Sequence, residues 1–159
     1  MKELETAIRL RAEGSLKESN KLFIDLVKEY SDNSVVNYQC AWSFDIMGLE
    51  RDAIPYYEKA IALGLPKEDL KGAFLGLGST YRTLGEYEKS REVFLKGLEL
   101  FPEDNAIKTF YAMTLYNLGE YSSAMIILLT NLAVTSADEN IKQYEKAIRF
   151  YANDLDKIW

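Results

Sequence analysis

The stretch Phe74–Pro102, with the sequence FLGLGSTYRTLGEYEKSREVFLKGLELFP, predicts two helices joined by a tight turn. Its first half has an apolar residue every three or four positions, at Phe74, Leu77, Tyr81 and Leu84. That is the spacing of one helix face. Gly85 then marks a helix end, because glycine adopts left-handed backbone conformations at little cost. Pro102 ends the second helix, since proline cannot continue one.

Two small residues in this stretch indicate how the two helices pack. Gly78 lies inside the first helix, where glycine costs about 1 kcal/mol relative to alanine. We expect the second helix to approach Gly78 closely, with Ser90 as the small residue that faces it. The second helix is expected to bury Tyr87, Val93, Phe94, Leu98 and Phe101.

The same pattern recurs along the chain in four columns that keep one register. The turn glycines are Gly14, Gly48, Gly85 and Gly119. The small residues of the first helices are Ala7, Ala41, Gly78 and Ala112, and those of the second helices are Ser19, Ala53, Ser90 and Ala124. A large apolar residue follows four positions later, at Phe23, Tyr57, Phe94 and Leu128. Four helix pairs are therefore predicted. Three extra residues precede the third pair, and we expect them to lengthen its first helix by about one turn, since Pro66 and the acidic residues after it favour a helix N-terminus.

These residues resemble the tetratricopeptide repeat, a 34-residue helix–turn–helix unit with the pattern W-x2-L-G-x2-Y…A-x3-F…P. Phe74 stands where tryptophan is usual and Ser90 where alanine is usual; the other named positions agree. The chain looks like the small stand-alone tetratricopeptide proteins of bacteria. The resemblance implies an all-α, right-handed solenoid in a single domain, 1–159. Its repeats span about 1–33, 34–67, 71–104 and 105–137, and a C-terminal capping helix spans about 138–159.

The capping helix is expected to cover the second helix of the fourth pair, which is apolar on nearly every side. Its apolar stripe consists of Ile141, Tyr144, Ile148, Tyr151, Leu155 and Ile158. Glu145, Lys146 and Arg149 stand where the repeats carry small or apolar residues, so they are expected to face water. The last element of a stacked array needs such a polar outer face.

Composition narrows the function classes. The formal net charge of −6 disfavours nucleic acid or an anionic membrane as the partner, because both attract basic surfaces. Cys40 is the only cysteine, which agrees with a reducing compartment, and we expect a buried structural thiol and a cytoplasmic protein. No apolar run approaches the length of a membrane span.

No sequence pattern predicts an enzyme. Histidine is absent, so the commonest general base and metal ligand is missing. Gly76 and Gly78 superficially resemble a phosphate-binding loop, but the register places them inside a helix. The carboxylate pairs Asp154/Asp156 and Glu103/Asp104 are expected to be solvated surface. We therefore expect no catalytic residue, no cofactor and no metal.

In tetratricopeptide arrays the first helices line a concave groove that binds peptides or helices of other proteins, and the resemblance implies the same here. The groove positions are Leu4, Ile8, Arg11, Tyr38, Trp42, Asp45, Leu75, Ser79, Arg82, Thr109, Met113, Tyr116 and Asn117. The residues expected to contribute most are Tyr38, Trp42, Arg82, Met113 and Tyr116, because aromatic residues and arginine dominate interfaces and methionine adapts to varied partners. The positions of the clamp that grips chaperone C-termini hold Leu4, Ile8, Gln39, Gly72 and Gly76, so that partner is not expected.

Three alternatives remain open at this level. Tyr38, Trp42 and Met113 could simply pack between neighbouring first helices. The apolar surface could bury against a second copy, which would make the protein a homodimeric scaffold. A regulator that senses a peptide or small molecule would instead have a deep pocket near Trp42 and Tyr116.

Overall fold

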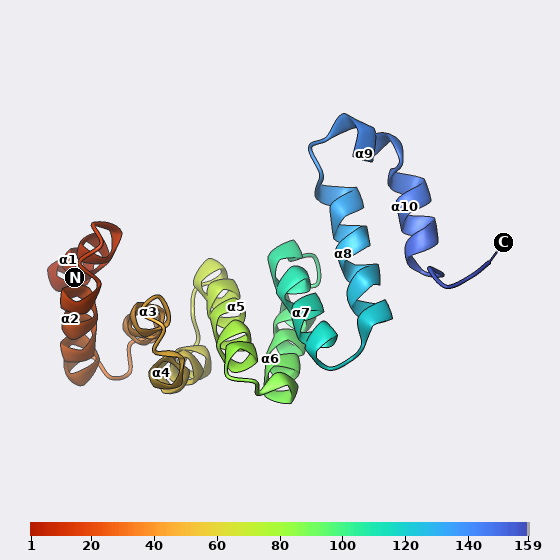
Figure 1. The fold of residues 1–159 in the computed structure, drawn as a ribbon. Helices are drawn as coiled ribbons and strands as arrows, with labels where there is room; N and C mark the ends of the chain where they lie inside the picture. The colour runs from red at the N-terminus through yellow and green to blue at the C-terminus, as the bar shows by residue number, and fades with distance from the viewer. Residues whose placement is uncertain (159) are drawn as a thin grey trace.

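The computed structural model describes residues 1–158, and within that range the chain forms ten helices and no strand (Figure 1). The first four helices are α1 (Lys2–Ala12), α2 (Leu16–Glu29), α3 (Ser34–Asp45) and α4 (Glu50–Leu63). The next four are α5 (Lys67–Thr83), α6 (Tyr87–Leu100), α7 (Asn105–Asn117) and α8 (Tyr121–Thr135). Two short helices follow, α9 (Glu139–Gln143) and α10 (Glu145–Ala152).

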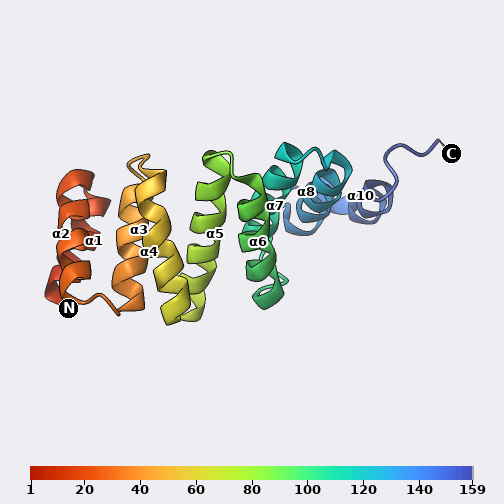
Figure 2. The ribbon, with the colours of Figure 1, turned by 90° about the horizontal axis from the view of Figure 1, so that it is seen from below.

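The first eight helices form four consecutive pairs in a right-handed solenoid, as the sequence predicted (Figures 1 and 2). Each first helix packs on its own partner, and α3, α5 and α7 also pack on both helices of the preceding pair. The first helices α1, α3, α5 and α7 therefore contact one another in succession, whereas α2, α4, α6 and α8 form no comparable interface among themselves. Successive first helices therefore lie closer together than successive second helices. This difference curves the array, with the first helices on its inner face.

The predicted contact between Gly78 and Ser90 is confirmed. The Ser90 hydroxyl donates a 2.7 Å hydrogen bond to the Gly78 carbonyl oxygen. A Cβ atom on Gly78 would lie 2.5 Å from the ring of Phe94, which is fully buried. The first pair has an equivalent bond, in which Ser19 donates to the carbonyl of Ala7 at 2.7 Å. The small residues in these two columns thus allow the two helices of a pair to come into direct contact.

The turn that joins α5 to α6 also forms as predicted. Gly85 has φ +77°, so it occupies the left-handed region that favours glycine. The N–H of Glu86 donates to the Tyr81 carbonyl at 2.9 Å and the N–H of Gly85 to that of Arg82 at 3.0 Å. These bonds satisfy carbonyls at the helix end. The insertion before this pair lengthens α5 to 17 residues, against 13 in α7.

The large apolar column is the centre of the core, except at its last position. Phe23, Tyr57 and Phe94 are exposed by 0%, 2% and 0%, because the next first helix covers each of them. Leu128 of α8 is still 36% exposed. The fourth pair therefore lacks the cover that the first three pairs have. Cys40 is buried, as expected, in what we call the first core cluster, which consists of Ala7, Phe23, Leu26, Val36 and Cys40.

The C-terminal cap predicted over 138–159 forms, but as two short helices, α9 and α10, instead of one continuous helix. The segment breaks at Tyr144, whose N–H bonds back to Ile141 at 3.0 Å in a tight turn. Helix α10 then runs beside α8 (Figure 1) and ends at Ala152, because Asn153 and Asp154 are weak helix formers. Residue 159 lies outside the described residues.

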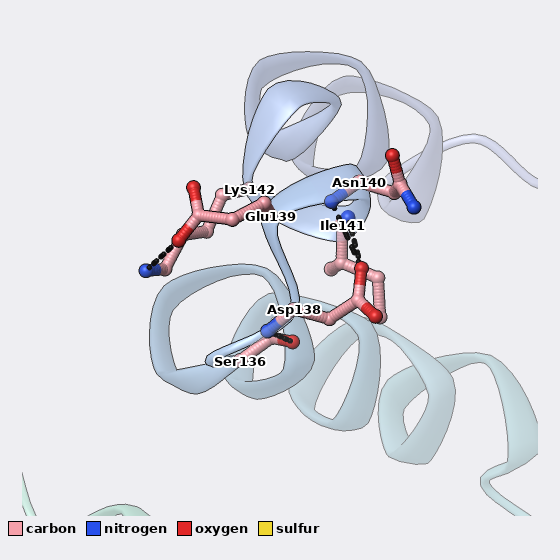
Figure 3. Close-up of polar contacts among 6 residues, drawn as sticks. All are labelled: Ser136, Asp138, Glu139, Asn140, Ile141 and Lys142. Carbon is pink, nitrogen blue, oxygen red and sulfur yellow. Dashed lines mark hydrogen bonds and ion pairs between the residues drawn. The ribbon is translucent and has the colours of Figure 1, made fainter.

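Local hydrogen bonds fix the start of this segment (Figure 3). The Asp138 carboxylate accepts the backbone N–H groups of Asn140 and Ile141 at 2.9 and 3.1 Å. The Ser136 hydroxyl accepts the N–H of Asp138 at 3.1 Å. This N-cap starts α9 directly after α8 and supports the change in chain direction.

The break also disrupts the predicted apolar stripe. Only Ile141 and Ile148 are partly buried, whereas the remaining members Tyr144, Tyr151, Leu155 and Ile158 are more than half exposed. The residue that α10 buries most completely is Ala152, which the stripe did not include. The segment packs on α8 but forms no extended interface with α7. It therefore covers one side of the fourth pair only.

Candidate functional site

The predicted groove residues lie on the first helices that form the inner face (Figure 1). The exposed members are Ile8, Trp42, Met113 and Tyr116. The half-buried members are Leu4, Arg11, Tyr38, Asp45, Leu75, Ser79, Arg82, Thr109 and Asn117. Most of this set falls into two regions, one around Trp42 and one around Tyr116, whereas Leu4 packs against the core and Thr109 accepts a hydrogen bond from Asn131.

Trp42 of α3 lines two adjacent hollows and is 41% exposed. The first, which we call the Ile8 hollow, has a volume of 380 Å³ and is lined by Ile8, Arg11, Ala12, Gln39, Trp42 and Ile46. The guanidinium carbon of Arg11 lies 3.9 Å from the centroid of the Trp42 ring. Arg11 also donates to the Gln39 backbone carbonyl at 3.3 Å and to its side-chain oxygen. The guanidinium is therefore held on the indole by a cation–π contact.

The second hollow, which we call the Asp45 hollow, has a volume of 300 Å³ and lies between α3 and α5. Its lining is Tyr38, Trp42, Asp45, Tyr57, Gly72, Leu75, Gly76, Ser79 and Phe110. The rings of Tyr38 and Trp42 stack with centroids 6.3 Å apart. Trp42 thus packs against its neighbour and still presents surface to solvent.

Asp45 is the only carboxylate in the lining of that hollow. Its two oxygens accept hydrogen bonds from the Tyr57 hydroxyl and from the Thr80 hydroxyl, both at 3.1 Å. Burial raises the pKa of Asp45 above its ordinary value, with a smaller contribution in the same direction from Glu50 and opposing ones from the two hydrogen bonds. Its charge is therefore only partly compensated.

The region around Tyr116 is a separate 300 Å³ hollow at the C-terminal end of the array. We call it the α7/α8 hollow, and its lining is Arg82, Ala112, Met113, Tyr116, Tyr121, Ala124, Met125 and Leu128. The Arg82 Nε donates to the side-chain oxygen of Asn117 at 2.9 Å. Trp42 and Tyr116 line different hollows, whereas a small-molecule sensor was expected to have one deep pocket near both residues.

Several lining residues were not among the predicted groove positions. Tyr57 lies on a second helix and reaches the inner face because Gly76 leaves room for its ring; a Cβ atom on Gly76 would lie 2.5 Å from it. Tyr121, Met125 and Leu128 of α8 were missed because α8 was expected to be covered. Spacings of four and then three residues along α8 are the signal that could have identified them.

The outer face has a larger but differently composed hollow of 530 Å³ between α4, α5 and α6, with Glu58, Lys89, Glu92 and Lys96 on its lining. The Tyr81 hydroxyl donates a 2.6 Å hydrogen bond to the Glu58 carboxylate there. Burial, followed by this bond and the charge of Glu58, raises the pKa of Tyr81. These internal contacts favour a structural role for the charged groups.

Neither a cluster of metal ligands nor a membrane-spanning helix occurs within the described residues. Within the described chain, 1–158, no three acidic or thiol side chains come together as metal ligands would. None of its helices is both long and apolar enough to cross a bilayer. Burial raises the pKa of Cys40 to about 12, so the thiol is not activated as a nucleophile.

Similar solved structures share the architecture. A crystal structure of MamA superposes with a TM-score of 0.75 at 17% identity, over 92% of this chain and 87% of that one. A crystal structure of YrrB, described as a tetratricopeptide protein with an unusual peptide-binding site, superposes with a TM-score of 0.65 at 16% identity, over 97% of this chain and 84% of that one. At these identities the likeness shows the fold alone.

Sequence comparison reaches the same family. Superkiller protein 3 of Saccharomyces cerevisiae (strain ATCC 204508 / S288c) is 31% identical over 94 residues, which are 55% of this chain and 6% of that protein. The match therefore spans a small part of that relative. The family model described as "Tetratrico peptide repeat" matches residues 34–155, most of the chain. This chain belongs to the tetratricopeptide repeat family.

Proposed function

We propose that the protein is a non-enzymatic interaction module that binds a peptide or helix of another protein along its inner face. The observation that carries the proposal is Trp42, which is 41% exposed between the Ile8 hollow and the Asp45 hollow. A large aromatic ring flanked by two hollows offers a central anchor and a place for side chains on either side of it. Interfaces concentrate their binding energy in such positions.

The neighbouring side chains support Trp42 as an anchor. Arg11 holds one side of the indole through its contact with Gln39, and Tyr38 stacks beside it. A side chain that is already ordered loses less conformational entropy when a partner binds.

The buried Cys40 agrees with a reducing compartment, and we place the protein in the cytoplasm on that ground.

The test compares three purified chains: wild type, Trp42→Ala and Leu95→Ala. Leu95 of α6 is also exposed, at 47%, but it lies on a second helix and serves as the matched control. Partners are captured from an extract of the producing cells, identified, purified and titrated by calorimetry. Trp42→Ala should weaken binding by about 2 kcal/mol, roughly 30-fold, whereas Leu95→Ala should leave it unchanged.

Folding of each variant is checked by circular dichroism before titration. Unchanged affinity in a folded Trp42→Ala chain would exclude the inner face around Trp42 as the binding site. Equal losses in Trp42→Ala and Leu95→Ala would indicate a general effect on the fold and would also count against the proposal.

A second candidate function is self-association as a homodimeric scaffold, and the α7/α8 hollow favours it. Leu128 is exposed there while its equivalents in the other three pairs are buried. The opposite end of the array is charged, with Glu3, Glu5 and Arg9 of α1 exposed. Two copies would therefore join through their apolar C-terminal ends, in a symmetric contact.

Light scattering over a hundredfold range of concentration tests this second candidate. A dimer of twice 18.2 kDa that Leu128→Lys converts to a monomer would support it. A monomer at every concentration would exclude it and would leave the α7/α8 hollow open to a different protein.

A further inference from the structure

The Asp45 hollow combines aromatic surface with a carboxylate. Tyr38, Trp42, Tyr57 and Phe110 contribute rings to its lining. Aromatic faces attract cations, most strongly when the site is shielded from water. At 300 Å³ the hollow has the volume of a small ligand pocket, so one long side chain can enter it.

The carboxylate of Asp45 has only neutral partners. Tyr57 and Thr80 each donate one hydrogen bond to it, and none of the ion pairs among residues 1–158 involves it. The Arg11 guanidinium is close enough to oppose the rise in the pKa of the Tyr38 and Tyr57 hydroxyls, but it lines the adjacent Ile8 hollow and donates to Gln39, not to Asp45. A partly desolvated anion without a cation favours the arrival of one.

We propose that the Asp45 hollow binds a basic side chain of the partner segment, with arginine preferred to lysine. Arginine is preferred because its planar guanidinium stacks on aromatic rings and also donates two hydrogen bonds to one carboxylate. Arg11 already places one guanidinium 3.9 Å from the centroid of the Trp42 ring, which is the same type of contact. This inference rests on the proposed function, and it specifies the chemistry of the partner.

Other occupants match the hollow less well. An apolar side chain would remove more water from Asp45 without supplying a counter-charge, which costs free energy. An acidic side chain would be repelled by Asp45 and by Asp69, which is close enough to Tyr38 to contribute to the raised pKa of that hydroxyl. The net charge of −6 likewise attracts basic segments to the protein.

The test uses two small probes that differ in charge and little else, N-acetyl-arginine amide and N-acetyl-citrulline amide. Citrulline replaces the guanidinium by a neutral urea group of similar shape. Both are titrated at constant ionic strength into ¹⁵N-labelled protein, and the indole signal of Trp42 is assigned with a Trp42→Phe chain. The arginine probe should bind in the millimolar range, about tenfold more tightly than the citrulline probe.

Asp45→Asn is the matched variant, because asparagine keeps the size and a hydrogen-bond acceptor but removes the charge. It should abolish the preference for arginine and leave the weak binding of citrulline in place. Asp52→Asn, on the exposed side of α4, is the control and should preserve the preference.

Each result of these titrations and of partner capture either supports the inference or counts against a specific claim. Arginine binding that depends on Asp45 supports the inference. Equal binding of both probes to the wild type, a preference for arginine that persists in Asp45→Asn, or no saturable shift would overturn it. Partner capture that Trp42→Ala abolishes and Asp45→Asn leaves intact would refute this inference while the proposed function stands. Capture insensitive to Trp42→Ala would refute the proposed function itself.

Discussion

Leu128→Ala is expected to cost much less stability than Leu77→Ala, although the two substitutions remove the same atoms. Leu77 of α5 is 4% exposed, whereas Leu128 of α8 lines the α7/α8 hollow and is 36% exposed. A buried leucine replaced by alanine loses its transfer free energy and also leaves a cavity, for a total of about 2–5 kcal/mol.

The magnitude at Leu128 follows from its partial exposure. The three carbon atoms that are removed contribute about 0.8 kcal/mol each when fully buried, or about 2.4 kcal/mol together. With about a third of the side chain already in water, the loss falls to about 1.5 kcal/mol. No closed cavity adds to it, because the hollow is open. Subtracting about 1.5 kcal/mol from about 2–5 kcal/mol, the two variants should differ by about 0.5–3.5 kcal/mol, and the middle of this range is several degrees in Tm for a chain of this size.

The measurement is equilibrium unfolding in urea at micromolar protein concentration, followed by circular dichroism and by tyrosine fluorescence. Coincident transitions are required before the free energies of unfolding are compared. If the two variants lose equal stability, Leu128 is covered in solution by α10 or by another chain, and the description of an uncovered fourth pair is refuted. Repeating the comparison at higher protein concentration separates those two covers.

Three further predictions follow from single residues. The raised pKa of Asp45 means that the folded chain holds this proton more tightly than the unfolded chain, so ionisation lowers stability as pH rises through that pKa. Asp45→Asn should therefore be more stable than wild type at neutral pH, with the difference vanishing below the ordinary carboxyl value of 3.8; a less stable variant in thermal melts at neutral pH would contradict this. Gly78→Ala should lower the Tm, because a clash with the buried Phe94 ring costs about 1–3 kcal/mol and outweighs a gain of about 1 kcal/mol in helix propensity; a raised Tm would show that the ring can move aside. Cys40 should react with a thiol reagent at pH 8 only on unfolding, since burial raises its pKa to about 12; rapid labelling of the native chain would show that the first core cluster opens.

The sequence predicted the repeat architecture because its determinants are local. Gly85 specifies a left-handed turn, Gly78 and Ser90 specify close approach, and each repeats in register along the chain. Contacts inside a pair and between adjacent pairs join residues that are near in sequence. The pattern of the stretch Phe74–Pro102 was therefore enough to predict all four helix pairs. The inner-face positions followed from the resemblance to the tetratricopeptide family, and Trp42 is exposed.

Only the tertiary structure decided which residues line the Asp45 hollow and whether Leu128 is covered. The Asp45 hollow needs Tyr57 from a second helix and Phe110 from the fourth pair, and their approach depends on the packing of α4, α5 and α7. At the C-terminus, the apolar stripe in the sequence is compatible with one long helix. The break at Tyr144 and the placement of α10 on α8 instead leave Leu128 uncovered. Periodicity records which face of a helix is apolar, but the surface that covers this face is determined only when the elements pack.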